Sequence, residues 1–450
     1  MLELRRIRAL VTELAAELLA AAPWPDLAAI ERAVAELAAA RGVETRQIGR
    51  ARDGTPIRAF GIAPPNADPA PVVLVVGVPR GDAPTGARTI LALARRLCDD
   101  AALLGELGVR WWFVPCADPA GARENAGWWR APLTLDTYAR RIVTPPPADR
   151  LDAFATPTPP EQRALRQLIA EERPRTALFL YDTPIGGFAL HQGPGAATAP
   201  WRRRAGDFAR LLDPLGLPLG QDGPLGPADS PTDPRADPRD PYARFRADLD
   251  RPVGAALSRL GPPDLDIGAV VAPLFVDYAR RERDRTTISA TRRAVAAEGL
   301  RLWREWFAFG RTALDLIAPT LPAALLARSA AQQALVEALR GAETILAEGL
   351  RWPALIPDPD GPATLAESFA HGDAVRLARL PRLATLVRFL AEAHVARAAD
   401  PPTVLTDALD RARETQTRWI DELAAATALR PLRRERTVAA QLGAILLALP

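Results

Sequence analysis

The sequence contains no lysine, and Met1 is the only methionine among its 450 residues. Its 57 positive charges are therefore all arginine, and they are set against 54 acidic residues. Both signs are spread along the chain, so the small excess does not form the basic stripe that a nucleic-acid-binding surface needs. We therefore expect no nucleic-acid partner. The use of arginine throughout, with abundant alanine and leucine, is typical of a GC-rich bacterial genome.

Cysteines and long apolar runs are also scarce. Cys98 and Cys116 are the only cysteines, and we expect both to pack as free thiols. Glu13 and Glu17 interrupt the apolar run near the N-terminus, which argues against a secretory signal peptide. No stretch reaches the roughly 18 apolar residues of a membrane span. These absences predict a cytoplasmic protein with no membrane partner.

The stretch from 72 to 129 contains the clearest structural pattern. The apolar run Val72–Val76 ends in a loop rich in glycine and proline, which is typical of a buried strand in a mostly parallel sheet. Apolar residues at helical spacing predict a helix over Thr85–Leu97, and Val109–Val114 predicts a second strand. In such sheets, ligands bind where strand ends meet loops. The sequence therefore predicts a site at the loop that follows Val76.

Other elements flank this stretch. Residues 2–22 predict an amphipathic helix, and a second helix is expected from Pro25 to about residue 40. Alternating polar and apolar residues on both sides of Asp53-Gly54 predict a hairpin from about 44 to 62. Further helices are predicted over 160–172 and 200–212, and further strands over Thr176–Tyr181 and Ile267–Phe275.

The pattern divides the chain into three parts. Residues 1–42 form an N-terminal helical segment, and residues 43–318 form an α/β domain with a Pro- and Asp-rich loop insertion at 213–251. The pattern is helical from Thr286 to about Ile317, and residues 319–450 predict an all-helical region. The expected fold class is α/β, with a mixed, mostly parallel central sheet and helices on both faces. Helix breaks are predicted at Pro353, Pro357, Pro381, Pro401 and Pro431.

Five phrases fall in a fixed order along residues 43–311. The first is the hairpin IGRARDGTPIRAFGI, followed by VVLVVGVPRGDAPTG and WWFVPCADPAGARENAGWW, and then by LFLYDTPIGG and VVAPLF. In this order and spacing they resemble phrases of the zinc carboxypeptidases of the carboxypeptidase A type. In that family the second phrase reads G-x-H-P-x-E-P-x-G, the fourth ends in L-H-D and the fifth reads T-E-x-P-x-F. The resemblance implies the fold of that family for the α/β region.

The resemblance also implies a zinc ion held by a His, a Glu three residues later and a second His, with a separate Glu as general base. The matching positions in this chain are Arg80, Ala83, Tyr181 and Ala272. Arginine offers no lone pair to a metal ion, and alanine has no functional group. A tyrosine could bind some metals, but here it has no second ligand beside it. We therefore predict that the zinc expected for the family is absent and that Ala272 leaves the site without a catalytic base.

Histidines do not restore the zinc site elsewhere. His191, His371 and His394 are the only histidines, and no histidine precedes residue 191. The last two lie in the predicted helical region. We expect each of the three to be a surface residue or a residue whose hydrogen bonds are satisfied within the fold.

A ligand-binding role could survive the loss of zinc chemistry. The family holds the terminal carboxylate of a peptide with an arginine, since a guanidinium fork matches a carboxylate with two hydrogen bonds. Arg123 best matches that arginine, with Asn125 nearby. Arg80 and Tyr181 are the other candidates for ligand contacts.

Several of these residues have structural alternatives. Arg123 could be tied to an acid such as Asp118 or Glu124. Four tryptophans could line a pocket for an apolar side chain, or they could fill the core beneath the loop. Three aspartates could converge at strand ends and bind a hard cation, although two of them are expected to cap turns. The tryptophans are Trp111, Trp112, Trp128 and Trp129, and the aspartates are Asp82, Asp118 and Asp182.

The sequence therefore predicts a catalytically inactive carboxypeptidase-like protein, or pseudoenzyme. It would serve as a binding or scaffold module for a peptide or another carboxylate-bearing ligand, and a protein partner could bind through its C-terminal helices. The alternative is an active metallocarboxypeptidase or amidohydrolase of peptides or amino-acid conjugates with a rearranged site. The zinc content of the purified chain separates the two.

Overall fold

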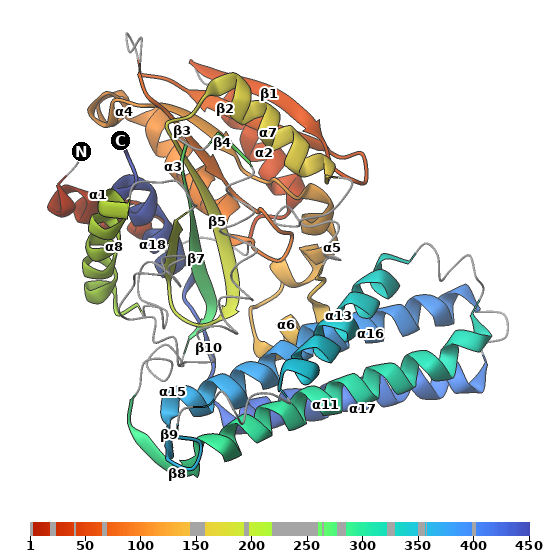
Figure 1. Cartoon of the computed structure of the whole chain (residues 1–450). Coiled ribbons are helices and arrows are strands. Elements are labelled where there is room, and N and C mark those ends of the chain that lie inside the picture. The colour runs from red at the N-terminus through yellow and green to blue at the C-terminus, as the bar shows by residue number, and fades with distance from the viewer. Residues whose placement is uncertain are drawn as a thin grey trace.

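The computed structural model has an α/β part built on one large sheet and a layer of long helices below it (Figure 1). It describes residues 3–18, 24–39, 42–64, 70–144, 158–192, 198–217, 260–262, 265–276, 285–321, 329–349, 356, 358–397 and 402–450. Among the described residues, no helix is both long enough and apolar enough to cross a membrane. Of the predicted loop insertion at 213–251, only residues 213–217 are described, and Asp213–Leu215 form a short 3-10 turn.

The central sheet is mixed, and its middle is parallel. Its strands follow the order β1-β2-β4-β3-β5-β7-β10, and β6 pairs with β7 at one side. β3, β4, β5 and β7 run parallel to their neighbours within this group, whereas β1, β2, β6 and β10 pair antiparallel. The strands are β1 Val43–Arg50, β2 Pro56–Ile62, β3 Val72–Val76, β4 Arg110–Val114, β5 Thr176–Ile185, β6 Ala189–Gln192, β7 Asp266–Val276 and β10 Arg430–Pro431.

Side-chain alternation along the strands gives the sheet two buried faces. Val73 and Val75 of β3 pack into one apolar cluster, and Leu74 and Val76 pack into another. The cluster that contains Val73 is covered by α1 (Leu4–Leu18), α2 (Leu27–Ala38), α3 (Thr85–Asp99), α8 (Thr198–Leu212) and α18 (Arg434–Leu447). The opposite face is covered by α7 (Pro160–Glu172). Helices therefore lie on both faces, as the sequence predicts.

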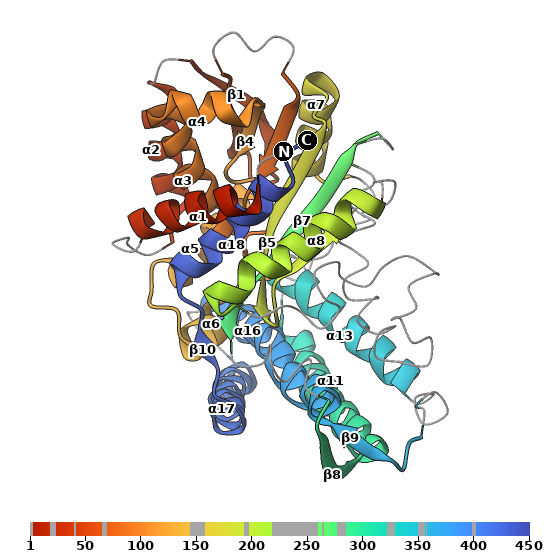
Figure 2. The same cartoon turned by 90° about the vertical axis from the view of Figure 1, so that its left-hand side faces the viewer.

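The C-terminal helix α18 returns to the sheet rather than staying with the helices before it. Its buried residues join the cluster of α1 and α3, and Figure 2 shows it running beside α1. Just before α18, β10 pairs with the end of β7 through Arg430 and Val276. The last part of the chain thus contributes to the core of the α/β part, although it lies far from β3 in sequence.

The layer below the sheet consists of long helices with their own core. These are α11 (Arg292–Ile317), α13 (Ala330–Gly349), α16 (Ala374–Ala396) and α17 (Thr403–Ala426), and the short helix α6 (Leu135–Arg141) packs on α16 and α17. Figure 1 shows them stacked across the lower end of the sheet. A small two-stranded sheet of β8 (Thr287–Thr291) and β9 (Pro362–Thr364) lies at one end of this layer.

The observed packing changes three predictions. The helix predicted from Thr286 begins only at Arg292, because residues 287–291 pair with β9 as a strand. Pro381 does not break a helix, since α16 continues through it with Leu380 and Leu383 fully buried on the layer's core. The predicted segments 43–318 and 319–450 do not coincide with the two packed groups, because α11 lies in the helical layer and α18 lies on the sheet.

Two short helices complete the α/β part. α4 (Ala101–Leu107), which the apolar spacing did not predict, follows α3 directly, and Asp100 accepts a hydrogen bond from the Leu103 amide at its start. α5 (Pro119–Trp129) follows β4 and is capped in the same way by Asp118. The loops after β3 and β4 lie at the same edge of the sheet, because these two strands are parallel neighbours.

Candidate functional site

The carboxyl ends of β3, β5 and β7 lie side by side, because these strands are parallel neighbours. The loop between β3 and α3 is anchored there by Asp118, whose carboxylate accepts a hydrogen bond from the Gly81 amide at 2.8 Å. Val78 in this loop has a φ of 43°, which is unusual for a β-branched residue. The fold thus holds the loop that carries Arg80 and Ala83 in one defined conformation.

Arg80 is paired within this loop. Its Nε donates to the Asp82 carboxylate at 2.9 Å, and its guanidinium lies 5.8 Å from the centre of the Tyr181 ring on β5. The Arg80 side chain remains 20% exposed, and that of Asp82 12% exposed. The structure therefore brings together two of the predicted ligand contacts, Arg80 and Tyr181, as a cation over an aromatic ring.

Asp182, the residue after Tyr181, caps the helix that follows the loop. Its Oδ2 accepts a hydrogen bond from the Thr85 amide at 2.8 Å, at the first turn of α3. Burial raises the pKa of Asp182 to about 7, although the Thr85 hydrogen bonds oppose this shift. Within the described part of the chain, its Oδ1 has no hydrogen-bond partner. The aspartate that the sequence suggested as a turn cap is therefore a helix cap supplied by a distant strand.

Tyr181 and Ala272 lie on neighbouring strands, but their side chains point to opposite faces of the sheet. Tyr181 packs in the cluster under α7, whereas Ala272 packs in the cluster under α3 and α18. In the β5–β7 register it is Asp182, not Tyr181, that lies opposite Ala272. A metal ligand and a general base must act on the same water molecule. The packing therefore does not support the assignment of Ala272 to the position of a base beside Tyr181.

The residues at this edge do not fit a zinc ion. Zinc is bound by thiolate, imidazole or carboxylate groups in a tetrahedral arrangement. Among the described residues, no three side chains of His, Cys, Asp or Glu are grouped closely enough to hold a metal ion. The three predicted ligand positions instead present a guanidinium, a methyl group and a phenol, and Asp82 in the same loop is paired with Arg80. His191 lies on β6, and His371 and His394 lie in the helical layer.

Arg123 makes its contacts with the hairpin turn rather than with the loop after β3. Its Nη1 donates to Asp53 at 2.5 Å and its Nη2 donates to Thr55 at 2.7 Å. The alternative that Arg123 is tied to an acid is correct, but the acid is Asp53 and not Asp118. Asp118 is instead paired with Arg52 at 2.7 Å. Arg123 therefore fastens the turn between β1 and β2 to α5.

Asn125 is fully engaged within the fold. Its Nδ2 donates to the carbonyl oxygens of Gly121 and Val143, and its Oδ1 accepts from the Val143 amide and the Trp128 indole. These four bonds use the whole hydrogen-bonding capacity of a carboxamide. Because the side chain is also completely buried, Asn125 has no group left for a ligand. The prediction of a ligand contact at Asn125 is not supported.

The tryptophans around the loop fill the core. Trp111, Trp112, Trp128 and Trp129 are all completely buried. Trp111 stacks on Phe113 with the ring centres 5.5 Å apart. The tryptophans therefore fill the core beneath the loop and do not line a pocket.

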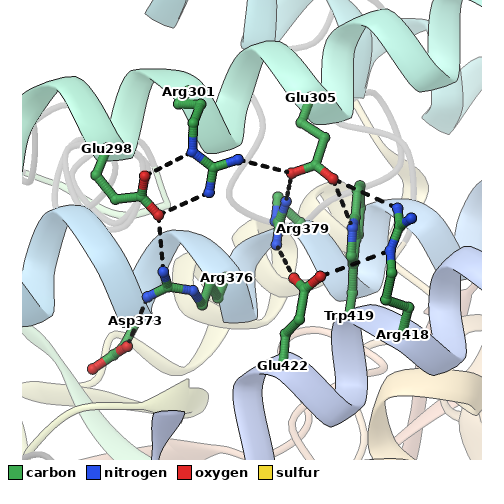
Figure 3. A network of polar contacts seen from close by, with 9 residues as sticks. All are labelled: Glu298, Arg301, Glu305, Asp373, Arg376, Arg379, Arg418, Trp419 and Glu422. Carbon is green, nitrogen blue, oxygen red and sulfur yellow. Dashed lines mark hydrogen bonds and ion pairs between the residues drawn. The ribbon is translucent and has the colours of Figure 1, made fainter. Parts of the chain in front are cut away.

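A second charged cluster lies in the helical layer, at residues that no sequence motif indicated (Figure 3). Arg379 of α16 has a completely buried side chain, and its Nη1 donates to Glu305 of α11 at 2.8 Å. Its guanidinium stacks on the ring of Trp419 of α17 at 4.0 Å. The sequence shows oppositely charged residues three or four positions apart along α11 and α17. It does not show that Arg379 is buried, because this burial depends on three helices that meet only in the folded chain.

The residues around Arg379 form an alternating chain of charges across the three helices. The chain runs from Asp373 to Arg376, on to Glu298 and Arg301, and then to Glu305. Arg379 and Arg418 then connect Glu305 with Glu422. A depression of about 450 Å³ opens beside this chain and is lined by Arg301, Glu305, Arg376, Glu422, Ala425 and Ala426.

No protein-family model matches this sequence, and none of the curated proteins is a significant match. Solved structures do match. A metallo-carboxypeptidase from Pseudomonas aeruginosa in complex with (2-guanidinoethylmercapto)succinic acid aligns with 17% identity and a TM-score of 0.37, over 55% of this chain and 60% of that chain. A carboxypeptidase A from Helicoverpa armigera aligns with 18% identity and a TM-score of 0.32, over 42% and 52%.

A third match is a metallo-carboxypeptidase from Burkholderia cenocepacia, with 14% identity and a TM-score of 0.32 over 41% of this chain and 49% of that chain. The chain therefore spans about half the length of these solved structures. These solved structures are of the kind of protein that the five sequence phrases resemble. At these scores, the chemistry of the chain has to be inferred from its own residues.

Proposed function

We propose that this chain is a carboxypeptidase-like protein without peptidase activity, which serves as a binding or scaffold module. The observation that carries the proposal is the pairing of Arg80 with Asp82 over the ring of Tyr181. A guanidinium stands where the resemblance requires a zinc ligand, and its positive charge disfavours the binding of a second cation there. Asp82 in the same loop is already paired with this arginine.

The other family positions, at Ala83, Tyr181 and Ala272, also lack the groups that would activate a metal-bound water. Ala83 and Ala272 are completely buried methyl groups, and Tyr181 and Ala272 pack on opposite faces of the sheet. A general base has to lie within hydrogen-bond reach of the proton that it removes. These residues therefore do not assemble the constellation of a metallopeptidase.

Binding at the sheet edge would depend mainly on Arg80. Of the four predicted ligand contacts, Arg123 is used by the hairpin turn and Asn125 is used by buried backbone groups. The Arg80 side chain is 20% exposed, so a carboxylate could pair with it in competition with Asp82.

The test is the metal content and peptidase activity of the full chain, purified without a histidine tag. We expect much less than one zinc per chain by mass spectrometry and no release of C-terminal residues from unblocked peptides in zinc-containing buffer. One tightly held zinc per chain, or turnover that a chelator abolishes, would overturn the proposal.

A variant separates the loss of the metal ligands from the loss of the general base. Arg80→His, Ala83→Glu and Tyr181→His, made together, restore the ligand types that the resemblance implies. We expect this variant to remain without peptidase activity even if it binds zinc, because Ala272 has no group that can act as a general base. Arg130→His, at an exposed position, controls for zinc that binds to any added histidine.

A further inference from the structure

We propose that the groove formed by α11, α16 and α17 binds a small zwitterionic ligand, such as a free α-amino acid or a short peptide with both ends charged. The groove is the depression of about 450 Å³ beside the charged chain of Figure 3. This volume lies in the range of pockets that hold small molecules. The proposal does not depend on whether the sheet edge hydrolyses peptides.

Both signs of charge line the groove in equal number. Arg301 and Arg376 supply two guanidinium groups, and Glu305 and Glu422 supply two carboxylates. A pure anion would meet two carboxylates, and a pure cation would meet two guanidinium groups. A molecule with one charge of each sign avoids both repulsions. Ala425 and Ala426 add small apolar side chains to the wall, which leaves space between the charged groups.

The Glu422 carboxylate can still accept hydrogen bonds. Its carboxylate lies 3.5 Å from Arg379 and 3.7 Å from Arg418, which is longer than a normal hydrogen bond. No hydrogen bond to Glu422 occurs within the described part of the chain, and its side chain is 41% exposed. An ammonium group, with three donors, would give this carboxylate the close partner that it lacks.

The arginines across the groove can receive a carboxylate. Arg301 uses its Nε and Nη2 on Glu298 at 2.7 and 2.8 Å, but its Nη1 reaches Glu305 only at 3.6 Å. Arg376 shares the same Glu298 at 2.9 Å. Two guanidinium groups are thus held together by one acid, and the Nη1 of Arg301 keeps donors that a ligand carboxylate can use.

Arg379 positions one of the two carboxylates that line the groove. Its buried guanidinium donates to Glu305 at 2.8 Å and lies 3.5 Å from Glu422, and its stacking on the Trp419 ring keeps it in place. The carboxylate of Glu305 is therefore positioned before a ligand arrives, which lowers the entropy cost of binding. Arg379 is in this sense a positioning residue and not a ligand contact.

The test uses the full chain and the dipeptide glycylglycine as the probe, with isothermal titration calorimetry or saturation-transfer NMR as the readout. Two derivatives serve as matched ligands, one acetylated at the amino end and one amidated at the carboxyl end. We expect binding of glycylglycine and binding at least about tenfold weaker for each derivative, since each lacks one charge-assisted contact. Equal binding of all three, or no binding of glycylglycine up to about 10 mM, would overturn the proposal.

Variants locate the site. Glu422→Gln and Arg301→Gln should each weaken the binding of glycylglycine about tenfold or more. Arg304→Gln, an exposed arginine next to Glu305 on α11, should leave it unchanged. Glu414 lines a neighbouring depression of about 620 Å³ but not this groove. If Glu414→Gln abolishes binding while Arg301→Gln does not, the ligand sits in the neighbouring depression and the proposal is wrong. Thermal melts followed by circular dichroism check that each variant is folded.

Discussion

The guanidinium of Arg80 lies 5.8 Å from the centre of the Tyr181 ring, at the carboxyl edge of the parallel strands. The two residues come from the loop after β3 and from β5, which are about a hundred residues apart in sequence, and the pairing of β3 with β5 brings them together. Both stand at positions where the resemblance implies zinc ligands. In this chain the edge is therefore occupied by a stacked cation and a phenol, with Asp82 balancing the charge.

Replacing the buried Arg379 should cost much of the helical layer's stability. Arg379→Ala removes a fully buried stem and the closer of the two arginines that Glu305 and Glu422 share, which leaves them with Arg418 at 3.6 and 3.7 Å. We expect the free energy of unfolding to fall by about 3 kcal/mol. Urea unfolding followed by tryptophan fluorescence measures the change. Arg304→Ala, on the exposed face of α11, should change it by no more than about 0.5 kcal/mol. Equal losses for the two variants would contradict a special role for Arg379.

Asn125 and Arg123 should respond differently, although both were candidates for ligand binding. Asn125→Ala leaves the Trp128 indole and the Val143 and Gly121 backbone groups without their partner in the core. A loss of at least about 2 kcal/mol is expected. Arg123→Ala breaks a pair whose arginine is 58% exposed, so a loss of less than about 1 kcal/mol is expected. Thermal melts of the two variants decide the matter, and a larger loss for Arg123→Ala would refute this account.

Stability should depend on pH through Asp182. Burial raises the pKa of its carboxyl from 3.8 to about 7, so the native chain keeps a proton that the unfolded chain loses at lower pH. The stability that this proton contributes is complete below about pH 4 and is lost as the pH rises toward about 7. Asp182→Asn cannot ionise and can still accept from the Thr85 amide. The free energy of unfolding of the variant minus that of the wild type should therefore increase between pH 5 and pH 8. A constant difference in urea titrations would contradict the assignment.

Gly81 should tolerate no side chain, whereas Gly105 should tolerate one easily. A Cβ on Gly81 would overlap the backbone of Gly121, where the loop after β3 lies against the start of α5. We expect Gly81→Ala to lower the free energy of unfolding by about 2 kcal/mol or more, because backbone has to move. A Cβ on Gly105 meets open space within α4, so Gly105→Ala should be neutral or stabilise by up to about 1 kcal/mol. Denaturation midpoints that move in the same direction would count against this packing.

Fragments 1–318 and 319–450 should not fold separately. The first would lose α18, whose buried residues Val438, Leu442 and Ile445 belong to the cluster of the sheet. It would also carry α11 without α16, although Trp306 of α11 is buried in the core of the helical layer. We expect each fragment alone to show no cooperative unfolding and the two together to associate when co-expressed. Cooperative urea unfolding of isolated 1–318 would restore the predicted boundary.

The local sequence pattern was enough to predict most of the elements. The strand Val72–Val76 and the helix Pro160–Glu172 have the bounds that their periodicity predicts, and the hairpin turns at Asp53-Gly54. These features are encoded within a few residues, since apolar spacing and turn residues act locally. The residues at the four zinc-site positions could also be identified from the sequence, because this step requires only an alignment of phrases.

The tertiary structure alone decided how the polar residues are used. Asn125 is hydrogen-bonded to Val143, Arg123 is paired with Asp53, and Arg379 is buried among three helices. It also decided that α18 closes the face of the sheet where α1 lies. Such pairings join residues far apart in the chain, and a hydrogen bond or ion pair has no periodicity that a local pattern could reveal. Which side chains remain available for a ligand therefore follows only from the packed fold.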